Sequence, residues 1–144
     1  NKTTMKFSIK DIDHKLLAKR AKVEAEQIFS KISTRKYRSF DEVFSTTLYG
    51  HVAEQYLIEK ELFKDDPRPY KDVINRNDVY VEVKVTKGDY YVPYVLERAN
   101  KAHKETFRDY PDLLYVFTAK SFKDEYSLCG IYEWDDREFV LQTP

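Results

Sequence analysis

A carboxylate and an ammonium group stand two positions apart in residues 78–88, which read DVYVEVKVTKG. Valines alternate there with polar residues, a pattern typical of a strand with two unlike faces, so Glu82 and Lys84 share one face with about 7 Å between their Cα atoms. The valines on the other face predict a central, covered strand, in which buried charges are costly without partners or a metal. The pair is therefore either a site of chemistry or a plain surface ion pair.

A second carboxylate is expected from the other strand of the same hairpin. The run KDVI precedes the turn residues NRND and the strand VYVEVKVT. The two runs predict a hairpin that brings Asp72 to the same end of the sheet as Glu82. Asp78 is a rival for this role, although NRND is more typical of a turn in which an aspartate bonds its own backbone.

A third carboxylate is expected from a helix, which a capping box formed by Ser39 and Glu42 would open. Helical periodicity places Glu54 in the middle of the mainly apolar stripe of this helix, where it serves the site or pairs with a core lysine. Gly50, one turn earlier, predicts a close approach of the helix to the sheet. His51, on the same side, either contacts the site or is a structural histidine.

Convergent carboxylates beside a lysine suit a hard divalent cation. Mg²⁺ prefers oxygen ligands and usually keeps water and substrate phosphate oxygens in its shell, and Mn²⁺ is expected to substitute for it. Such a metal polarises a phosphoryl group and lowers the pKa of a bound water, while the ammonium group orients the nucleophile or neutralises developing charge. The residue types therefore point to phosphodiester chemistry.

Apolar periodicity and turn residues predict the elements that must position these side chains. Helices are expected over about residues 11–32, 39–63 and 92–109, and strands over residues 71–74, 79–86, 113–119 and 126–134. The basic KISTRKYR is expected to be a loop, and the prolines of KDDPRPY should stop the second helix. The order α, α, β, β, α, β, β predicts an α/β or α+β fold, with helices packed on a mixed sheet.

Length and composition predict one globular domain over residues 1–144. The hydrophobic fraction of 42% supports a core, and no apolar run approaches the roughly 20 residues of a membrane helix. No apolar signal region is visible near the start, and the single cysteine, Cys129, is expected to be a small buried residue in a reducing compartment. We therefore expect a cytoplasmic protein without a membrane partner.

Positive charge is concentrated at the start of the chain. Residues 1–38 carry eleven Lys and Arg against four acids, a net charge of +7, and the remainder of the neutral chain carries −7. The segment predicts either a surface for a polyanion or a solvated helix face. The expected substrate contacts are Lys19, Arg20, Lys22, Arg35, Lys36 and Arg38, with Thr86 and Lys101 from later elements. Tyrosines such as Tyr90 and Tyr94 either stack on bases or build the core.

Asp72, the EVK of residues 82–84 and Glu54 in GHVAEQYL together resemble the PD-(D/E)XK nuclease superfamily, which includes many restriction enzymes, junction resolvases and repair nucleases. Their order is also that of the family, whose core is a helix, a hairpin with the Asp and the (D/E)XK, a crossover helix and a further strand. The resemblance covers about residues 39–134 and leaves residues 1–38 as a basic helical extension. It departs at the first motif, where Lys71 rather than Pro precedes the Asp.

The resemblance implies a restriction-endonuclease-like fold and a role for each matching position. Asp72 and Glu82 become metal ligands, with the backbone carbonyl of Val83 as a third. Lys84 becomes the catalytic lysine, and Glu54 an auxiliary ligand or an acid that positions water.

The expected function is that of a Mg²⁺-dependent endonuclease acting on DNA. Cutting of both strands would favour a homodimer, although no heptad or other interface pattern demands one. Two alternatives stay open. One is a nucleic-acid-binding module of the same fold without catalysis, and the other is a regulatory domain that binds another protein.

Overall fold

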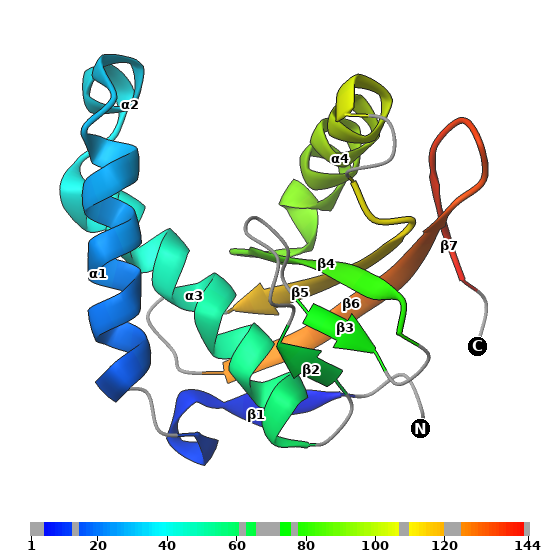
Figure 1. Cartoon of the computed structure of the whole chain (residues 1–144), viewed down its shortest axis with the longest axis horizontal. Coiled ribbons are helices and arrows are strands. Elements are labelled where there is room, and N and C mark those ends of the chain that lie inside the picture. The colour runs from blue at the N-terminus through cyan, green and yellow to red at the C-terminus, as the bar shows by residue number, and fades with distance from the viewer. Residues whose placement is uncertain are drawn as a thin grey trace.

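The computed structural model describes residues 5–12, 15–60, 63–65, 73–75, 78–106, 110–119 and 125–142. Its elements are β1 (Lys6–Ser8), η1 (Ile9–Asp11), α1 (Lys15–Phe29), α2 (Ile32–Tyr37), α3 (Phe40–Glu59), β2 (Phe63–Asp65), β3 (Val73–Asn75), β4 (Tyr80–Thr86), η2 (Asp89–Tyr91), α4 (Val92–Thr106), β5 (Leu113–Ala119), β6 (Glu125–Trp134) and β7 (Phe139–Leu141). Figure 1 shows α1 and α3 side by side next to the sheet.

One mixed sheet joins the described strands. Its order is β1-β6-β5-β4-β3-β2, and β7 pairs with β6. β4 and β5 are parallel, whereas the other described pairs are antiparallel. Parallel neighbours need a crossover connection, which α4 supplies between β4 and β5. The expected mixed sheet flanked by helices is therefore confirmed, and β4 lies inside the sheet rather than at its end.

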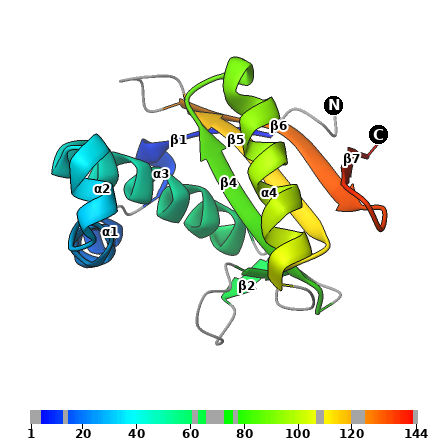
Figure 2. The same cartoon turned by 90° about the horizontal axis from the view of Figure 1, so that it is seen from above.

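Each face of the sheet carries its own apolar cluster. Val81 and Val83 of β4 pack with Val52, Ala53 and Leu57 of α3 on one face. The other face packs Leu114 and Val116 of β5 with Ala99 of α4, Tyr132 and Phe139. Figure 2 shows α3 and α4 on opposite sides of β4. The strand is thus covered by a helix on each face, as its valines predicted.

The helices differ from the prediction at their ends. α3 begins after the expected cap, because Ser39 Oγ accepts a hydrogen bond from the backbone N–H of Glu42 at 3.2 Å. This is the Ser39 half of the expected capping box; the Glu42 carboxylate accepts a hydrogen bond from Ser39 Oγ at 3.4 Å. It ends at Glu59, and the expected continuation to residue 63 is wrong, since Phe63 begins β2. The loop expected for KISTRKYR is also wrong, because residues 32–37 form α2. This helix buries no residue, so no apolar periodicity marked it.

The three-residue strands β1, β2 and β7 were missed, because they are too short to display an alternating pattern, whereas β3 was predicted from its position before the turn. β1 pairs with β6 at the edge of the sheet, and its Phe7 lies opposite Tyr126. The Phe7 ring is buried between Tyr56, at 3.9 Å between ring centroids, and Tyr126, at 4.8 Å. The start of the chain thus contributes a core residue through a contact across more than 100 positions. In the described stretches, none of the helices is long and apolar enough to span a membrane.

Candidate active site at the edge of β4

Glu82 and Lys84 form an ion pair on β4. The distance between Lys84 Nζ and Glu82 Oε2 is 2.9 Å, and the Lys84 side chain is 45% exposed against 13% for Glu82. At such exposure an ion pair contributes at most about 1 kcal/mol, so the fold gains little from it. The close pairing agrees with the expected shared face, and it holds a largely covered carboxylate next to an accessible ammonium group.

Strand register determines the face from which these two side chains project. Glu82 pairs with Leu114 and Lys84 with Val116, and directly paired residues point to the same side of a sheet. Leu114 and Val116 belong to the cluster beneath α4. The two charged side chains therefore leave β4 on the α4 face, while Val81 and Val83 face α3. Val79, expected to continue the valine face, is exposed and precedes the strand, so that part of the prediction is wrong.

A pocket of about 470 Å³ brings these charged groups together with residues of α1 and α3. Its lining comprises Glu24 of α1, Thr46, Thr47, Gly50, His51 and Glu54 of α3, and Glu82, Val83, Lys84 and Val85 of β4. We call it the acidic pocket. Because α3 covers one face of β4 and Glu82 projects from the other, a pocket lined by both must pass around the edge of the strand. In the described ladder, β3 reaches only Tyr80 and Val81 along that edge.

Glu54 faces this pocket, as its position in the apolar stripe of α3 predicted. A methyl group at position 50 would lie 3.9 Å from Glu54 Oε2 of the same helix, and no described atom of the sheet lies within 4 Å of it. The expectation that Gly50 permits a close approach of α3 to the sheet is therefore wrong. The missing side chain instead leaves space beside the Glu54 carboxylate.

His51 makes a contact of each kind expected under its two alternative roles. Its Nε2 lies 2.9 Å from Glu24 Oε2, and the imidazole also lines the acidic pocket. Glu24 was missed as a site residue, because on α1 it reads as one of several charges on a solvated helix. Only the packing of α1 beside α3 brings this carboxylate to the pocket, and no local sequence pattern announces such a contact (Figure 1).

The donor set of the acidic pocket suits a hard cation but is incomplete in the described stretches. Glu24, Glu54 and Glu82 offer carboxylate oxygens, the ligand type that Mg²⁺ prefers. Within the described stretches, no group of three His, Cys, Asp or Glu side chains lies close enough together to hold a metal ion. Asp72, the expected first ligand, lies outside the described residues.

Asp78, the rival of Asp72, has the backbone of a turn residue. Its φ of 62° lies in the left-handed region, which aspartate tolerates in turns, and its side chain is exposed. It does not belong to the lining of the acidic pocket. These observations favour the turn interpretation of NRND.

The expected basic contacts are exposed but fall into different places. Arg38 Nη2 donates a hydrogen bond to Thr46 Oγ1 at 3.1 Å, which brings this guanidinium to the rim of the acidic pocket. Arg35 Nη1 donates to the carbonyl oxygens of Phe29 and Ser30 at 3.3 and 2.7 Å, so it caps the end of α1. The remaining expected contacts on α1 and α2 are also exposed, namely Lys19, Arg20, Lys22 and Lys36.

The two candidates from later elements also separate. Thr86 lines a neighbouring pocket at the end of β4. Lys101 lies with Glu97 and Lys104 in another hollow along α4, and it is not part of the lining of the acidic pocket.

Cys129 has the environment of an unreactive thiol. The side chain is partly buried, and its S–H donates to Asp89 Oδ1 at 3.2 Å. Burial, followed by the neighbouring Asp89, raises the pKa of the thiol to about 11. Since the thiolate is the nucleophilic form, the thiol is not activated at neutral pH.

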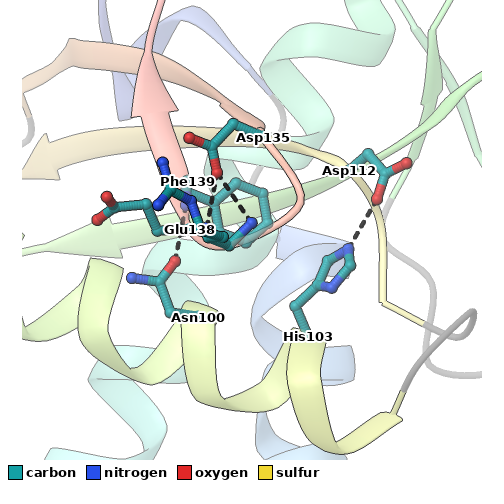
Figure 3. A network of polar contacts seen from close by, with 7 residues as sticks. Asn100, His103, Asp112, Asp135, Glu138 and Phe139 are labelled. Carbon is teal, nitrogen blue, oxygen red and sulfur yellow. Dashed lines mark hydrogen bonds and ion pairs between the residues drawn. The ribbon is translucent and has the colours of Figure 1, made fainter.

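A second polar cluster lies away from the acidic pocket, where α4 meets β7 and the strand ends (Figure 3). His103 Nε2 lies 2.7 Å from Asp112 Oδ1, and its ring stacks on Trp134 at 3.8 Å between centroids. Asn100 Oδ1 accepts a hydrogen bond from the backbone N–H of Phe139 at 2.7 Å. These contacts join α4 to β7 and to the segment before β5.

The turn between β6 and β7 is closed by Asp135. Its Oδ1 accepts hydrogen bonds from the backbone N–H groups of Arg137 and Glu138, each at 2.9 Å (Figure 3). These two hydrogen bonds lower the pKa of the Asp135 carboxyl, and the bond from Glu138 has the larger effect. The carboxylate is thus used within its own turn.

No family model, curated protein or solved structure matches the chain. The functional conclusion therefore depends on the residues of the site and their geometry.

Proposed function

We propose that the protein is a Mg²⁺-dependent nuclease of the PD-(D/E)XK type, which hydrolyses phosphodiester bonds as an endonuclease on DNA. One observation carries the proposal: Glu82 and Lys84, 2.9 Å apart on a strand inside the sheet, line one pocket with Glu54. Three residues of the motif, two on β4 and one on α3, thus line the same pocket.

The arrangement of elements supports the finer assignment to a restriction-endonuclease-like fold. α3 is followed by β2, by the antiparallel pair β3 and β4, by α4 and by β5, and apart from β2 this is the order that the resemblance implies. The parallel pairing of β4 with β5 places α4 as the crossover helix. In this proposal α1 and α2 are an addition to the core, and α1 contributes Glu24 to the pocket.

Asp72 and Glu82, with the backbone carbonyl of Val83, are the proposed metal ligands. In the antiparallel pair of β3 and β4, Val73 lies opposite Val81. Asp72 precedes Val73 in the sequence, and Glu82 follows Val81. Paired carboxylates and a carbonyl match the all-oxygen coordination of Mg²⁺, and Glu54 would bind through water. Bound there, the ion supplies electrophilic polarisation of the phosphoryl group and a more acidic water.

The residues of the chain position the other participants in the reaction. Lys84 directs a partly exposed ammonium group to a phosphate oxygen, where it neutralises charge that develops in the transition state. Glu82 holds Lys84 in place through their ion pair. The Glu54 carboxylate accepts a hydrogen bond from the attacking water and so orients it. Arg38, at the rim, binds a neighbouring phosphate without reading sequence.

Cleavage of supercoiled plasmid and of short single-stranded DNA and RNA tests the proposal. We expect cutting with Mg²⁺ or Mn²⁺ but not with EDTA, and loss of cutting in Lys84→Ala and Asp72→Asn. Lys104→Ala is the matched control, because it removes an exposed lysine that lies outside the acidic pocket. Metal-dependent cutting that persists unchanged in Lys84→Ala would refute the site assignment.

A binding module of the same fold without catalysis is the second candidate. It is favoured by the exposed cations of α1 and α2, which can contact phosphates whether or not a metal is bound. Salt-sensitive binding with no cutting of any substrate would support it, since phosphate contacts release counterions. Failure to bind any nucleic acid would point instead to a regulatory domain that binds protein.

A further inference from the structure

A second pocket follows the acidic pocket along the same strand. It measures about 540 Å³ and is lined by residues of α3, the end of β4, η2 and α4. Thr46 and Val85 line both pockets, so the two are adjacent. From Lys84 in the acidic pocket to Lys87 in the second pocket, the chain advances three residues, about 10 Å at strand spacing.

Exposed tyrosine rings distinguish this second pocket, which we call the tyrosine pocket. Tyr90 is 78% exposed, Tyr91 48% and Tyr94 56%. Tyr90 and Tyr91 meet edge to face, with 5.5 Å between their centroids and 87° between their planes. The rings stand on η2 and on the first turn of α4, so the backbone that carries them is regular. Large aromatic side chains gathered on a surface usually mark a binding site rather than a core.

The charge of the tyrosine pocket suits a polyanion. Lys87, after β4, and Arg98, one helical turn beyond Tyr94, both belong to the lining. No acidic side chain is among its described lining residues. The nearby Asp89 accepts a hydrogen bond from Cys129 and lines a neighbouring hollow, which Lys87 also lines. Aromatic faces next to cations are the combination that binds bases and phosphates of single strands.

We propose that the tyrosine pocket binds an unpaired nucleotide next to the phosphate that is cut in the acidic pocket. The substrate is then single-stranded DNA, or a duplex that is locally unpaired at the site. Tyr90 and Tyr94 stack on bases, whose faces are available only outside a duplex, while Lys87 and Arg98 bind the adjoining phosphates. The part of this inference that concerns cleavage rests on the proposed nuclease function, but binding does not.

Fluorescence anisotropy in EDTA tests binding separately from cleavage. The probes are a fluorescein-labelled single-stranded DNA and the duplex of the same sequence, with the full chain as the protein. The variants are Tyr90→Ala/Tyr94→Ala, the ring-preserving Tyr94→Phe, and Tyr37→Ala as a control for an exposed tyrosine on α2, outside the pocket. Thermal unfolding of each variant checks that it is folded.

We expect the double variant to bind the single strand at least tenfold more weakly, with little change for the duplex. Tyr94→Phe and Tyr37→Ala should bind as the parent does. Equal loss for both probes, no loss, or a Tyr94→Phe defect as large as that of the double variant would overturn the inference. So would binding of neither probe by the parent protein, which would point to a protein partner.

The two proposals can fail independently. Metal-dependent cutting without any preference for unpaired substrates would overturn the inference and leave the nuclease proposal standing. Selective, tyrosine-dependent binding of single strands without cutting under any metal would overturn the nuclease proposal and leave the binding inference standing.

Discussion

Two histidines on different helices make the same contact in very different surroundings. His51 of α3 pairs with Glu24 at 2.9 Å, and His103 of α4 pairs with Asp112 at 2.7 Å. His51 faces a pocket that also holds Glu54, Glu82 and Lys84. The ring of His103 is instead stacked on Trp134 and meets Phe139 and Tyr110 edge to face.

A histidine paired with a carboxylate therefore does not by itself mark an active site. The aromatic rings around His103 occupy the space that a substrate would need. The polar groups nearby are used by the fold, since Asn100 and Asp135 each bind backbone N–H groups. Around His51 the neighbours are charged side chains that line open volume. The first arrangement stabilises the contact of α4 with β7, whereas the second can bind and polarise a ligand.

The largest effect is expected on the cleavage rate, which should depend on the acidic pocket and not on the region around His103. Glu82→Gln should reduce metal-dependent cleavage by about 1,000-fold, because it removes a carboxylate from the proposed metal site but keeps the size of the side chain. Initial rates of plasmid nicking measure it. Glu133→Gln is the matched control, as Glu133 is exposed on β6, outside the acidic pocket, and it should cut at the parent rate. Equal cleavage rates for Glu82→Gln and Glu133→Gln would show that cleavage does not depend on the acidic pocket.

The next effect separates the regions by stability. His103→Ala should lower the free energy of unfolding by about 2 kcal/mol, because it removes the stack on Trp134 and the hydrogen bond to Asp112. Urea denaturation measures the change. The cleavage rate per folded molecule should stay at the parent value. A loss of activity without a loss of stability would place His103 in a functional site and contradict our assignment.

A smaller effect is expected from the other histidine. His51→Gln should change the free energy of unfolding by no more than about 1 kcal/mol, because the contact with Glu24 is partly exposed. It should lower the cleavage rate about tenfold, because the groups around the proposed metal site would be misplaced. The same urea and nicking measurements apply, with His103→Gln as the matched variant. If His51 had a purely structural role, His51→Gln would lower the free energy of unfolding markedly and leave the cleavage rate per folded molecule unchanged.

The smallest effect concerns the pH dependence of the structural region. A carboxyl whose pKa is lowered by folding stabilises the fold above its unfolded pKa, and the stabilisation is lost as the pH falls through the folded value. Asp135→Asn should therefore lower the melting temperature slightly at pH 7, and the difference should shrink as the pH falls below about 4. Asp136→Asn, one residue along the same turn, is the control. A difference in melting temperature that grows as the pH falls would contradict a lowered pKa of the Asp135 carboxyl.

Much of the framework was predictable from the sequence because its signals are local. The alternating valines marked β4, and the apolar runs marked β5 and β6, because side-chain period and burial are written in consecutive residues. The start of α3 followed from the Ser39 cap. The shared face of Glu82 and Lys84 followed from strand geometry alone, and the inward direction of Glu54 from helical period.

Other elements escaped prediction because nothing in their own residues demands them. β1 depends on Phe7 reaching Tyr126 and Tyr56, and α2 buries no residue that would produce a periodic pattern. The role of Gly50 was also predicted wrongly. A glycine in a helix indicates that space is needed at that position, but the sequence does not show which neighbouring atoms lie there.

Local patterns in the sequence were enough to predict the shared face of Glu82 and Lys84 and the inward direction of Glu54, because side-chain periods repeat over a few neighbouring positions. Which of these faces meet depends on the packing of the elements. It brought Glu24 of α1 to His51, passed the acidic pocket around the edge of β4, and joined it to the exposed rings of Tyr90 and Tyr94. Such meetings arise from the packing of helices on a sheet, where partners lie tens of residues apart and no local pattern records the contact.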